Sequence, residues 1–431
     1  MARIAVVGGG PKAAALAARC AVLRDRLGSG RVPELIIFER ERVGAAWDGD
    51  GAFSSGFLTL CTPGEKDVGF PYGEQGPGDP FGPLLSSDLF ARFSWPAFLV
   101  ANDLYADWVD RDRAHPNHAL FAKYLGWVFE QAGQTLVQAE VKRVSRVNDK
   151  WCVESVKDGW RNPMIVDGVV LTGCGDARRL AGQEKIAPDR VFDAASFWPN
   201  RARFLDAGPQ KIVVAGNGGS AGTIVAWLAE RYLENDKQIH SISPMGTLFP
   251  RGDGHAERRW FSDPSDWQSL TLADRKLLLE RTEAGVISMR IKRVIDGSAK
   301  IRYEMGKARS VAIDADDMLS IDVETPSGSS TAIEADLLVN ALGFDRWSLL
   351  KLVDHPAAAA ATAPGGKGSP AQDLRDSIEA NIDRYLSMPA DFDFPPGLHV
   401  PALADLAQGP AMSNLGALGL MATKLLARYV Q

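Results

Sequence analysis

The chain has 431 residues, enough for about two or three domains, and its 48 basic and 54 acidic residues leave a net charge of −6. This balance argues against nucleic acid as a partner, because binding to nucleic acid usually needs a basic excess. The four cysteines contain no C-x-x-C pair, which excludes a thioredoxin-like redox pair, a Cys-ligated zinc ribbon and a disulfide-stapled secreted domain.

The chain opens with a strand, a glycine-rich loop, a helix and a second strand. Residues 3–7 and 34–38 are short apolar runs typical of buried parallel strands, and residues 11–26 predict an alanine-rich helix. The loop contains Gly8, Gly9, Gly10, Pro11, Lys12 and Ala13. It fits the G-x-G-x-x-A fingerprint in the strand–loop–helix context that dinucleotide binding requires.

This first loop predicts a site for a dinucleotide pyrophosphate. The first glycine permits a tight turn, the second lets the phosphates approach the backbone, and the helix N-terminus offers free N–H groups. Glu39 ends the second strand, and we expect it to lie in the cofactor site with its neighbour Arg40. A carboxylate there accepts hydrogen bonds from ribose hydroxyls and repels a 2′-phosphate, so this loop favours FAD or NAD over NADP.

A long segment rich in glycine and proline comes next. Residues 44–90 show little periodicity, and a loop of this length is usually functional. Residues 96–132 predict helical structure with many aromatic side chains, which suit core packing or a dry pocket. Residues 136–157 and 164–171 predict strands.

The opening pattern recurs 208 residues later (216 minus 8). Residues 211–215 and 238–243 predict strands, and residues 221–233 predict the helix between them. The second loop contains Gly216, Asn217, Gly218, Gly219, Ser220 and Ala221. No carboxylate ends its second strand, and three arginines follow, namely Arg251, Arg258 and Arg259. This combination favours a 2′-phosphate, and hence NADPH over NADH.

The C-terminal half supplies the remaining elements. Residues 271–283 predict a helix, and residues 288–340 predict several strands, the last at 336–340. The low-complexity stretch 354–371 is expected to be a surface loop. The last helix is predicted to start near Ser413 and to run towards the C-terminus.

Two such units predict an α/β fold with two Rossmann-like, dinucleotide-binding domains and a small helical substrate region. We expect the FAD domain to be discontinuous, with the NADPH domain inserted in it. The predicted parts are 1–195 (FAD domain, with a helical aromatic segment at 90–132), 196–335 (NADPH domain) and 336–431 (second part of the FAD domain, with a helix that contacts substrate and flavin). A flavin disulfide reductase is excluded, because Cys20 and Cys61 are too far apart to form its redox pair.

Several stretches resemble the N-hydroxylating flavin monooxygenases of siderophore biosynthesis, and the chain is most similar to the mycobactin-type lysine N6-monooxygenases. The most specific are residues 65–72 (EKDVGFPY) and 261–267 (FSDPSDW). Residues 44–47 (GAAW), 94–110 and 408–415 (QGPAMSNL) match as well. The resemblance spans nearly the whole chain.

The resemblance implies a reaction that uses FAD, NADPH, O₂ and an amine. NADPH reduces FAD, O₂ adds at flavin C4a, and the hydroperoxyflavin oxidises the side-chain amine of an amino acid, with L-lysine N6 as the first choice. The cofactor supplies the oxygen chemistry, so we predict no catalytic side chain. An ammonium is not a nucleophile, and a lysine-like amine has a pKa of about 10.4, so an alkaline activity optimum is expected.

The resemblance also implies roles for individual residues at the flavin. Trp47 corresponds to an aromatic residue beside the flavin, and Val141 is expected to contact adenine through its backbone. A C-terminal segment is expected to reach the flavin and to cap the last helix through Ser413 or Asn414. Its assigned residues are Gln408, Ser413, Asn414 and Leu415.

Substrate recognition is assigned to Lys66 and Arg258. Ornithine hydroxylases of the family hold the substrate carboxylate with a lysine in an F-L-K-D-L stretch, where residues 57–60 of this chain (FLTL) have none. Lys66 lies several residues further on. Arg258 stands where the family has an asparagine before its F-x-D-P segment, and an arginine can clamp a carboxylate bidentately.

Other substrates and activities stay open at this point. The amine can be ornithine, a diamine or an acylated lysine, and the same cofactors also support Baeyer–Villiger or sulfur oxidation. An uncoupled homologue would make peroxide alone. Family members are often homo-oligomers, so self-association is open too. No signal peptide, membrane span or metal-site spacing is evident, so we expect a cytoplasmic protein without a metal.

Overall fold

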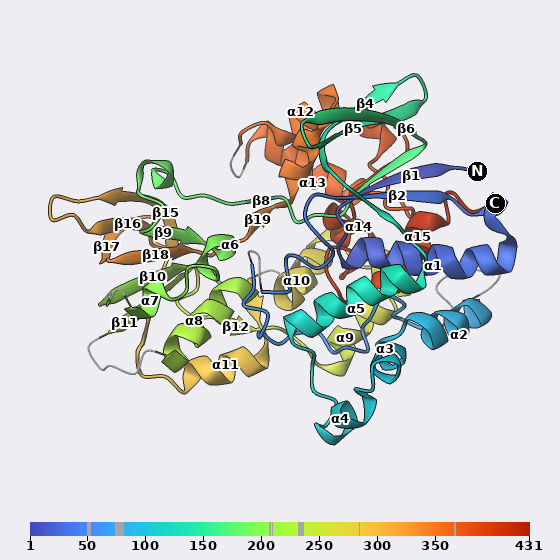
Figure 1. The fold of residues 1–431 in the computed structure, drawn as a ribbon. Helices are drawn as coiled ribbons and strands as arrows, with labels where there is room; N and C mark the ends of the chain where they lie inside the picture. The colour runs from blue at the N-terminus through green and yellow to red at the C-terminus, as the bar shows by residue number, and fades with distance from the viewer. Residues whose placement is uncertain are drawn as a thin grey trace.

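The computed structural model describes residues 1–49, 53–73, 82–206, 208, 210–231, 237–283, 285–365 and 368–431. Two parallel five-stranded sheets form two halves, at the right and left of Figure 1. The first sheet has the order β21 (Leu398–His399), β7 (Gly168–Leu171), β1 (Arg3–Val7), β2 (Glu34–Glu39) and β3 (Leu136–Gln138). The second has the order β14 (Ile301–Met305), β11 (Gln238–Ser243), β10 (Lys211–Ala215), β18 (Leu337–Asn340) and β9 (Val191–Asp193).

The strand that precedes each glycine loop lies at the centre of its sheet. β1 pairs in parallel with β2 and β7, and β10 pairs in parallel with β11 and β18. Both central strands are apolar and buried on both faces, as in parallel sheets generally. The bounds predicted for β1, β10 and β11 are confirmed. Each loop therefore opens at the carboxyl edge of its sheet, where such folds bind ligands.

Helices cover the sheets and begin where their sequences allow. α1 (Pro11–Leu27) starts at a proline, which suits the first turn because its N–H would have no helical partner. The predicted helical region 96–132 consists of three helices, α3 (Trp95–Ala101), α4 (Tyr105–Asp110) and α5 (His118–Gln131). In the part of the chain that the structure describes, no helix has the length and apolar character needed to cross a membrane.

Parts of two predicted segments lie outside the described residues. The predicted loop 44–90 ends in a helix, α2 (Gly82–Phe93), and its positions 50–52 and 74–81 are not described. The helix predicted at 221–233 is α8 (Gly219–Arg231), and residues 232–236 are not described. Short helices α6 (Ala194–Phe197) and α7 (Arg203–Asp206) precede β10.

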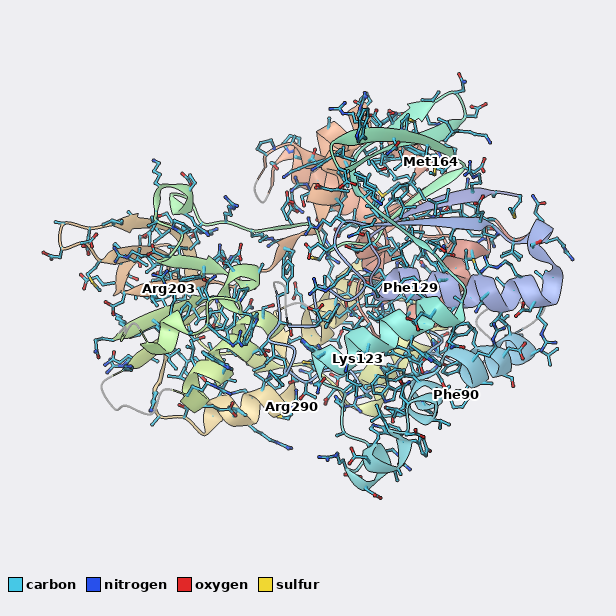
Figure 2. The ribbon with its side chains drawn as sticks, in the orientation of Figure 1. Phe90, Lys123, Phe129, Met164, Arg203 and Arg290 are labelled. Atoms are coloured by element: carbon cyan, nitrogen blue, oxygen red, sulfur yellow. The ribbon has the colours of Figure 1, made fainter. Side chains whose placement is uncertain are left out.

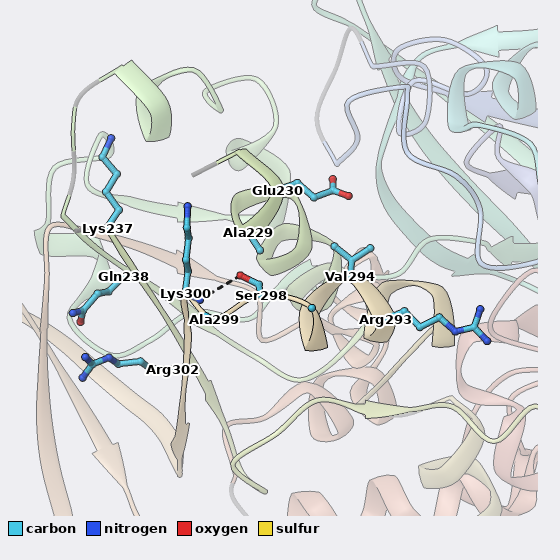
Figure 3. A pocket seen from close by; sticks show the side chains of 11 residues that line it. Ala229, Glu230, Lys237, Gln238, Arg293, Val294, Ser298, Ala299, Lys300 and Arg302 are labelled. Carbon is cyan, nitrogen blue, oxygen red and sulfur yellow. Dashed lines mark hydrogen bonds between the residues drawn. The ribbon is translucent and has the colours of Figure 1, made fainter. Parts of the chain in front are cut away.

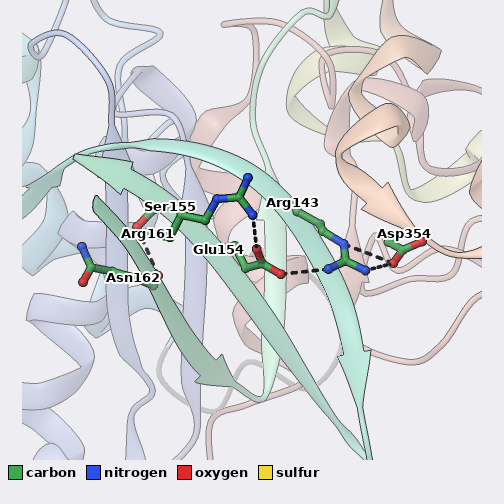
Figure 4. Close-up of polar contacts among 6 residues, drawn as sticks. All are labelled: Arg143, Glu154, Ser155, Arg161, Asn162 and Asp354. Carbon is green, nitrogen blue, oxygen red and sulfur yellow. Dashed lines mark hydrogen bonds and ion pairs between the residues drawn. The ribbon is translucent and has the colours of Figure 1, made fainter. Parts of the chain in front are cut away.

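A further sheet, built mainly from antiparallel pairs, extends each half. One comprises β15 (Lys307–Ile313), β16 (Leu319–Glu324) and β17 (Ser330–Ala335), and the other β20 (Val353–Asp354), β4 (Glu140–Val147), β5 (Lys150–Lys157) and β6 (Trp160–Val166). In the second of these, Arg143 of β4 lies 3.1 Å from Glu154 of β5 and also pairs with Asp354 of β20 (Figure 4). Such exposed ion pairs contribute at most about 1 kcal/mol, so the backbone pairing sets the register.

The sheet pairing corrects the predicted domain boundaries. β9 and β18 both belong to the second sheet, although residues 1–195 and 336–431 were assigned to the FAD domain. A short apolar strand can extend either sheet, so local sequence does not select its partner. The chain passes between the halves through β8 (Asp176–Ala177) and β19 (Phe344–Asp345), which pair with each other.

A helical insertion leaves the second half and packs against the first. It follows β12 (Phe249–Pro250) and contains α9 (His255–Ser262) and α10 (Leu272–Thr282), drawn in yellow in Figure 1. The Trp267 indole between these helices donates to the Leu406 carbonyl at 3.0 Å, in α14 (Asp405–Gln408). The insertion therefore joins the two halves.

The chain after the insertion departs from the prediction of strands from residue 288. After β13 (Val286–Ile287), residues 289–296 form a helix, α11 (Met289–Asp296), capped by the Ser288 side chain. Arg290 of α11, which is labelled in Figure 2, donates to the Thr59 carbonyl at 3.0 Å.

Two C-terminal predictions are wrong. The expected surface loop 354–371 contains α12 (Pro356–Thr362) and the start of α13 (Pro370–Asn381), and Ala358 and Ala361 are buried. Its alanine run is low in complexity yet has the highest helix propensity. The last helix, α15 (Leu418–Leu426), starts at its N-cap Ala417, so neither Ser413 nor Asn414 caps it.

Candidate functional site

The first glycine loop has the geometry that a pyrophosphate requires. Gly8 has φ of +107°, and a Cβ there would lie 2.5 Å from the Thr172 hydroxyl. A Cβ on Gly10 would meet no atom within 4 Å, so its backbone faces open space. α1 has no side-chain hydrogen bond at its N-cap, which leaves its first N–H groups available to an anion. The loop thus fits a dinucleotide.

Glu39 holds this loop in shape. Its Oε2 accepts from the Gly9 N–H at 2.8 Å, and its Oε1 accepts from the Glu41 N–H at 2.9 Å. A carboxylate has about four acceptor sites, so Glu39 retains capacity for a ribose hydroxyl. Arg40 is exposed and lies 3.5 Å from the Glu41 carboxylate.

The side chain of Lys12 contacts two backbone carbonyls beside the loop. Its buried ammonium donates to the carbonyl of Ser413 at 2.9 Å and lies 3.4 Å from that of Thr172. Burial lowers the pKa of Lys12 to about 8. Ala13 next to it is fully buried and lets α1 pack closely on the sheet.

The second glycine loop borders a cavity of about 360 Å³ at the carboxyl ends of β10 and β11. Gly216 and Asn217 line it, and Cβ atoms on Gly218 or Gly219 would meet nothing within 4 Å. Ser220 is exposed at the start of α8, and Ala221 is buried beneath it.

Three cations that local sequence did not single out line the same cavity: Arg178, Lys307 and Arg309. They come from segments far from the loop in sequence, and only the strand order brings them to it. Arg258 and Arg259, expected near this loop, instead pair with Asp253 at 3.1 Å and with Asp263 at 3.5 Å.

A larger cavity, of about 820 Å³, lies at the opposite edge of the second sheet (Figure 3). Its lining includes Lys237 and Gln238 at the start of β11, and Lys300 and Arg302 at the start of β14. Parallel sheets bind ligands at the carboxyl ends of their strands, and this cavity lies at the opposite ends of β11 and β14.

The family-like stretches 65–72, 261–267 and 408–415 meet at one place. The Phe70 carbonyl accepts from the Gly419 N–H at 2.8 Å, which joins the first stretch to the start of α15. A Cβ on Gly416 would lie 2.5 Å from the Phe261 ring, and one on Gly409 would lie 2.7 Å from Pro264. The long loop, the insertion and the C-terminal segment therefore form one site.

Lys66 lies at the centre of this site. Its ammonium stands 5.3 Å from the Phe70 ring and 5.0 Å from the Phe261 ring. Among the described residues it has no hydrogen-bond or ion-pair partner. Burial, followed by the positive charges of Arg258 and Arg251, lowers the pKa of Lys66 to about 8. A cation of this kind is set to receive an anion.

Arg251 adds a second free donor. Its Nε is buried and has no hydrogen-bond partner among the described residues. Since buried donors are almost always satisfied, this orphaned N–H indicates a ligand that completes the site. Arg258 shares one face of α9 with Phe261, three residues on, and so points towards the same region.

Contacts with α3 and α5 hold the loop that carries Lys66 in place. The buried Asp67 carboxylate accepts from the N–H groups of Gly69 at 3.0 Å and Trp95 at 2.8 Å. The Tyr124 hydroxyl donates to the Phe93 carbonyl at 2.7 Å. These aromatic residues are core packing that also positions the site.

The remaining predicted residues have these places. Trp47 packs edge-on against His118 and Phe121, with centroids 4.9 and 5.6 Å apart. Val141 is buried in β4, beside a register shift. The Gln408 amide donates to the Ile382 carbonyl at 2.9 Å and accepts from Lys424 at 3.1 Å, so its side chain is already engaged. Asn414 accepts from the Gly416 N–H at 2.7 Å, and Leu415 packs on the core.

Known proteins resemble the chain along its whole length. Residues 87–345 match the family described as L-lysine 6-monooxygenase/L-ornithine 5-monooxygenase. The L-lysine N6-monooxygenase MbtG of Mycobacterium sp. (strain MCS) is 34% identical, over 99% of this chain and 94% of that protein. MbtG of Mycolicibacterium paratuberculosis is 31% identical, over 99% and 95%. The lysine monooxygenase NbtG of Nocardia farcinica has a solved structure that matches with a TM-score of 0.82 and 30% identity, over 99% and 100%.

Proposed function

The chain belongs to the L-lysine 6-monooxygenase/L-ornithine 5-monooxygenase family, and from that premise we propose that it converts L-lysine to N6-hydroxylysine with FAD, NADPH and O₂. The family predicted from the sequence is confirmed, and the protein is a flavin-dependent amine N-monooxygenase. Lysine is favoured over ornithine because the full-length relatives that are 31% and 34% identical are L-lysine N6-monooxygenases. The product would serve siderophore biosynthesis.

One observation supports the amino-acid substrate most directly, namely the unpaired ammonium of Lys66 between two aromatic rings. With Arg251 and Arg258 it forms a cluster of positive charge, which we call the cation cluster. A carboxylate at this cluster gains charge-assisted hydrogen bonds. A diamine lacks the carboxylate and is repelled, so the cluster favours an amino acid over cadaverine.

The substrate amine must lose a proton before it can react. Deprotonating a lysine-like amine at pH 7 costs about 4–5 kcal/mol, at about 1.36 kcal/mol per pKa unit. Burial and neighbouring cations reduce this cost, because both disfavour the ammonium form. Lys66 itself illustrates the effect, since its pKa falls to about 8 here.

The two glycine loops would hold the cofactors. Gly8, Gly10 and the N-terminus of α1 suit the FAD pyrophosphate, and Gly216, Gly218 and the N-terminus of α8 suit that of NADPH. When bound, the flavin supplies the oxygen chemistry, and the protein supplies binding, orientation and exclusion of water.

The decisive experiment measures NADPH oxidation by the FAD-loaded protein, with hydroxylamine and peroxide quantified together. The amines are lysine, ornithine, cadaverine and an acylated lysine. We expect hydroxylamine from lysine in near-equal amount to the NADPH consumed, and little from cadaverine. Peroxide alone with every amine would overturn the proposal. Preference for ornithine would keep the activity class and change the substrate.

The cavity at the second loop predicts the choice of nicotinamide cofactor. Replacing Arg178 and Lys307 together by alanine should raise the KM for NADPH at least tenfold and leave that for NADH nearly unchanged, because each charged hydrogen bond to a 2′-phosphate is worth about 1.5–3 kcal/mol. Steady-state oxidation of both cofactors measures this. Lys300→Ala, at the other cavity, is the control. An equal loss for NADPH and NADH would contradict the assignment.

A further inference from the structure

Three ionisable side chains from distant parts of the chain meet at the backbone of residues 411–413. Glu283, just after α10, accepts from the Ala411 N–H at 2.7 Å. Asp405 of α14 accepts from the Ser413 N–H at 2.9 Å. Lys12 of α1 donates to the Ser413 carbonyl at 2.9 Å. We call these three residues the backbone clamp.

The segment that they hold has no regular structure of its own. It runs between α14 and α15, so helix hydrogen bonds do not fix it. Ala411 has φ of +75°, a left-handed conformation that costs a residue with a Cβ about 1–2 kcal/mol. A strained backbone persists only where its surroundings impose it. The clamp supplies that restraint through charge-assisted bonds, which are stronger than neutral ones.

Burying the backbone clamp carries a large desolvation cost, which indicates a functional role. Lys12 and Asp405 are buried, and charges removed from water carry a large desolvation cost. Arg346 offsets part of it by pairing with Asp405 at 3.1 Å. Glu283 has no salt bridge among the described residues, and Asp405 acts on it as a like charge. Apolar side chains would hold a purely structural turn at lower cost.

Glu283 comes from the insertion that also carries Arg258 of the cation cluster. Desolvation, followed by the charge of Asp405, raises the pKa of Glu283 to about 8. Its carboxyl group is therefore largely protonated at neutral pH and still accepts from Ala411 through its carbonyl oxygen. Glutamine is its nearest neutral mimic.

We propose that Glu283, Asp405 and Lys12 are positioning residues, which fix the backbone at 411–413 and thereby present residues 413–415 to the flavin. Glu283 belongs to the insertion that carries Arg258 of the cation cluster. It therefore holds this insertion and residues 413–415 in one fixed arrangement. This inference rests on the proposed binding of FAD beside residues 413–415.

The test compares Glu283→Ala and Glu283→Gln in the full-length protein. After removal of the flavin, FAD is titrated back and its fluorescence and visible absorption are followed. We expect Glu283→Ala to raise the Kd for FAD about tenfold and to alter the visible band, since one hydrogen bond and its restraint on Ala411 are lost. Glu283→Gln should restore both. Glu280→Ala, on the exposed face of α10, should match the wild type.

The outcomes separate the inference from the function on which it rests. Unchanged Kd and spectrum in a folded Glu283→Ala protein would overturn the positioning role. A wild-type protein that binds no FAD would instead overturn the proposed function. If Glu283→Ala does not fold, Lys12→Met tests the same clamp from the Ser413 carbonyl. Wild-type FAD binding in that variant would also overturn the inference.

Discussion

Gly216→Ala is expected to lower kcat/KM for NADPH about 100-fold while FAD remains bound. A Cβ at this position would lie 2.2 Å from the Ala341 carbonyl oxygen, and the residue has φ of +143°. Neither Gly216 nor the Ala341 carbonyl can move easily. β10 pairs with β18, and the Gly216 N–H donates to the Ile242 carbonyl at 3.0 Å. Strain of this kind costs about 1–3 kcal/mol, and at about 1.4 kcal/mol per tenfold the upper end gives that loss.

Gly218→Ala is the matched variant that isolates the cofactor contact. A Cβ there would meet no protein atom within 4 Å, so the unfolding temperature of the cofactor-free protein should not change. The KM for NADPH should still rise, because the added methyl group occupies the space through which the pyrophosphate approaches the backbone. Thermal unfolding and NADPH kinetics on both variants check this. Wild-type NADPH kinetics in Gly216→Ala would show that the second loop does not bind the cofactor.

Sequence predicts an element well where the local residue pattern alone determines the structure that the element adopts in the fold. β1 and β10 are short apolar runs bounded by glycines, and a run of that kind has few structures open to it. The glycines that follow predict a turn that needs positive φ, and Gly8 and Gly216 both have positive φ. Low complexity predicts a loop at α12, whereas its run of alanines favours the helix that forms there.

The parts that sequence could not predict depend on contacts between distant segments. Arg178 and Lys307 reach the second loop only through the order of the strands. Glu283 is one of many surface-like glutamates in sequence, and only the packing of α10 on α14 brings it to Ala411. Lys66 and Arg258 were singled out from the family resemblance, and the structure brings both to one site through the insertion.

Lys66→Met is expected to raise the KM for lysine between about 10- and 100-fold and to change kcat little. The methionine keeps the length and the contact with the rings of Phe70 and Phe261 but removes the charge. The lost interaction with a carboxylate is worth about 1.5–3 kcal/mol. Because the carboxylate is bound equally before and during the reaction, its loss affects KM rather than kcat. Lys123→Met, on the exposed side of α5, is the control.

The pH dependence of this interaction follows from the same residue. The pKa of Lys66 is lowered to about 8, so in the free enzyme its ammonium is charged below pH 8 and loses its proton above it. The KM for lysine should therefore rise as pH passes through about 8. Lys66→Arg should remove this rise, since the pKa of arginine stays above about 12.

Titration of Lys66 and titration of the substrate amine should therefore have opposite effects as pH rises. The first weakens substrate binding, and the second speeds the reaction. A bound carboxylate favours the charged form of Lys66 and raises its pKa in the complex, so kcat should not show the loss. The substrate amine becomes nucleophilic only when it loses its proton, so kcat should increase with pH. Measuring kcat and KM separately across this range resolves the two effects. A wild-type KM that stays flat through pH 8, or an equal rise in Lys66→Arg, would remove Lys66 from substrate binding.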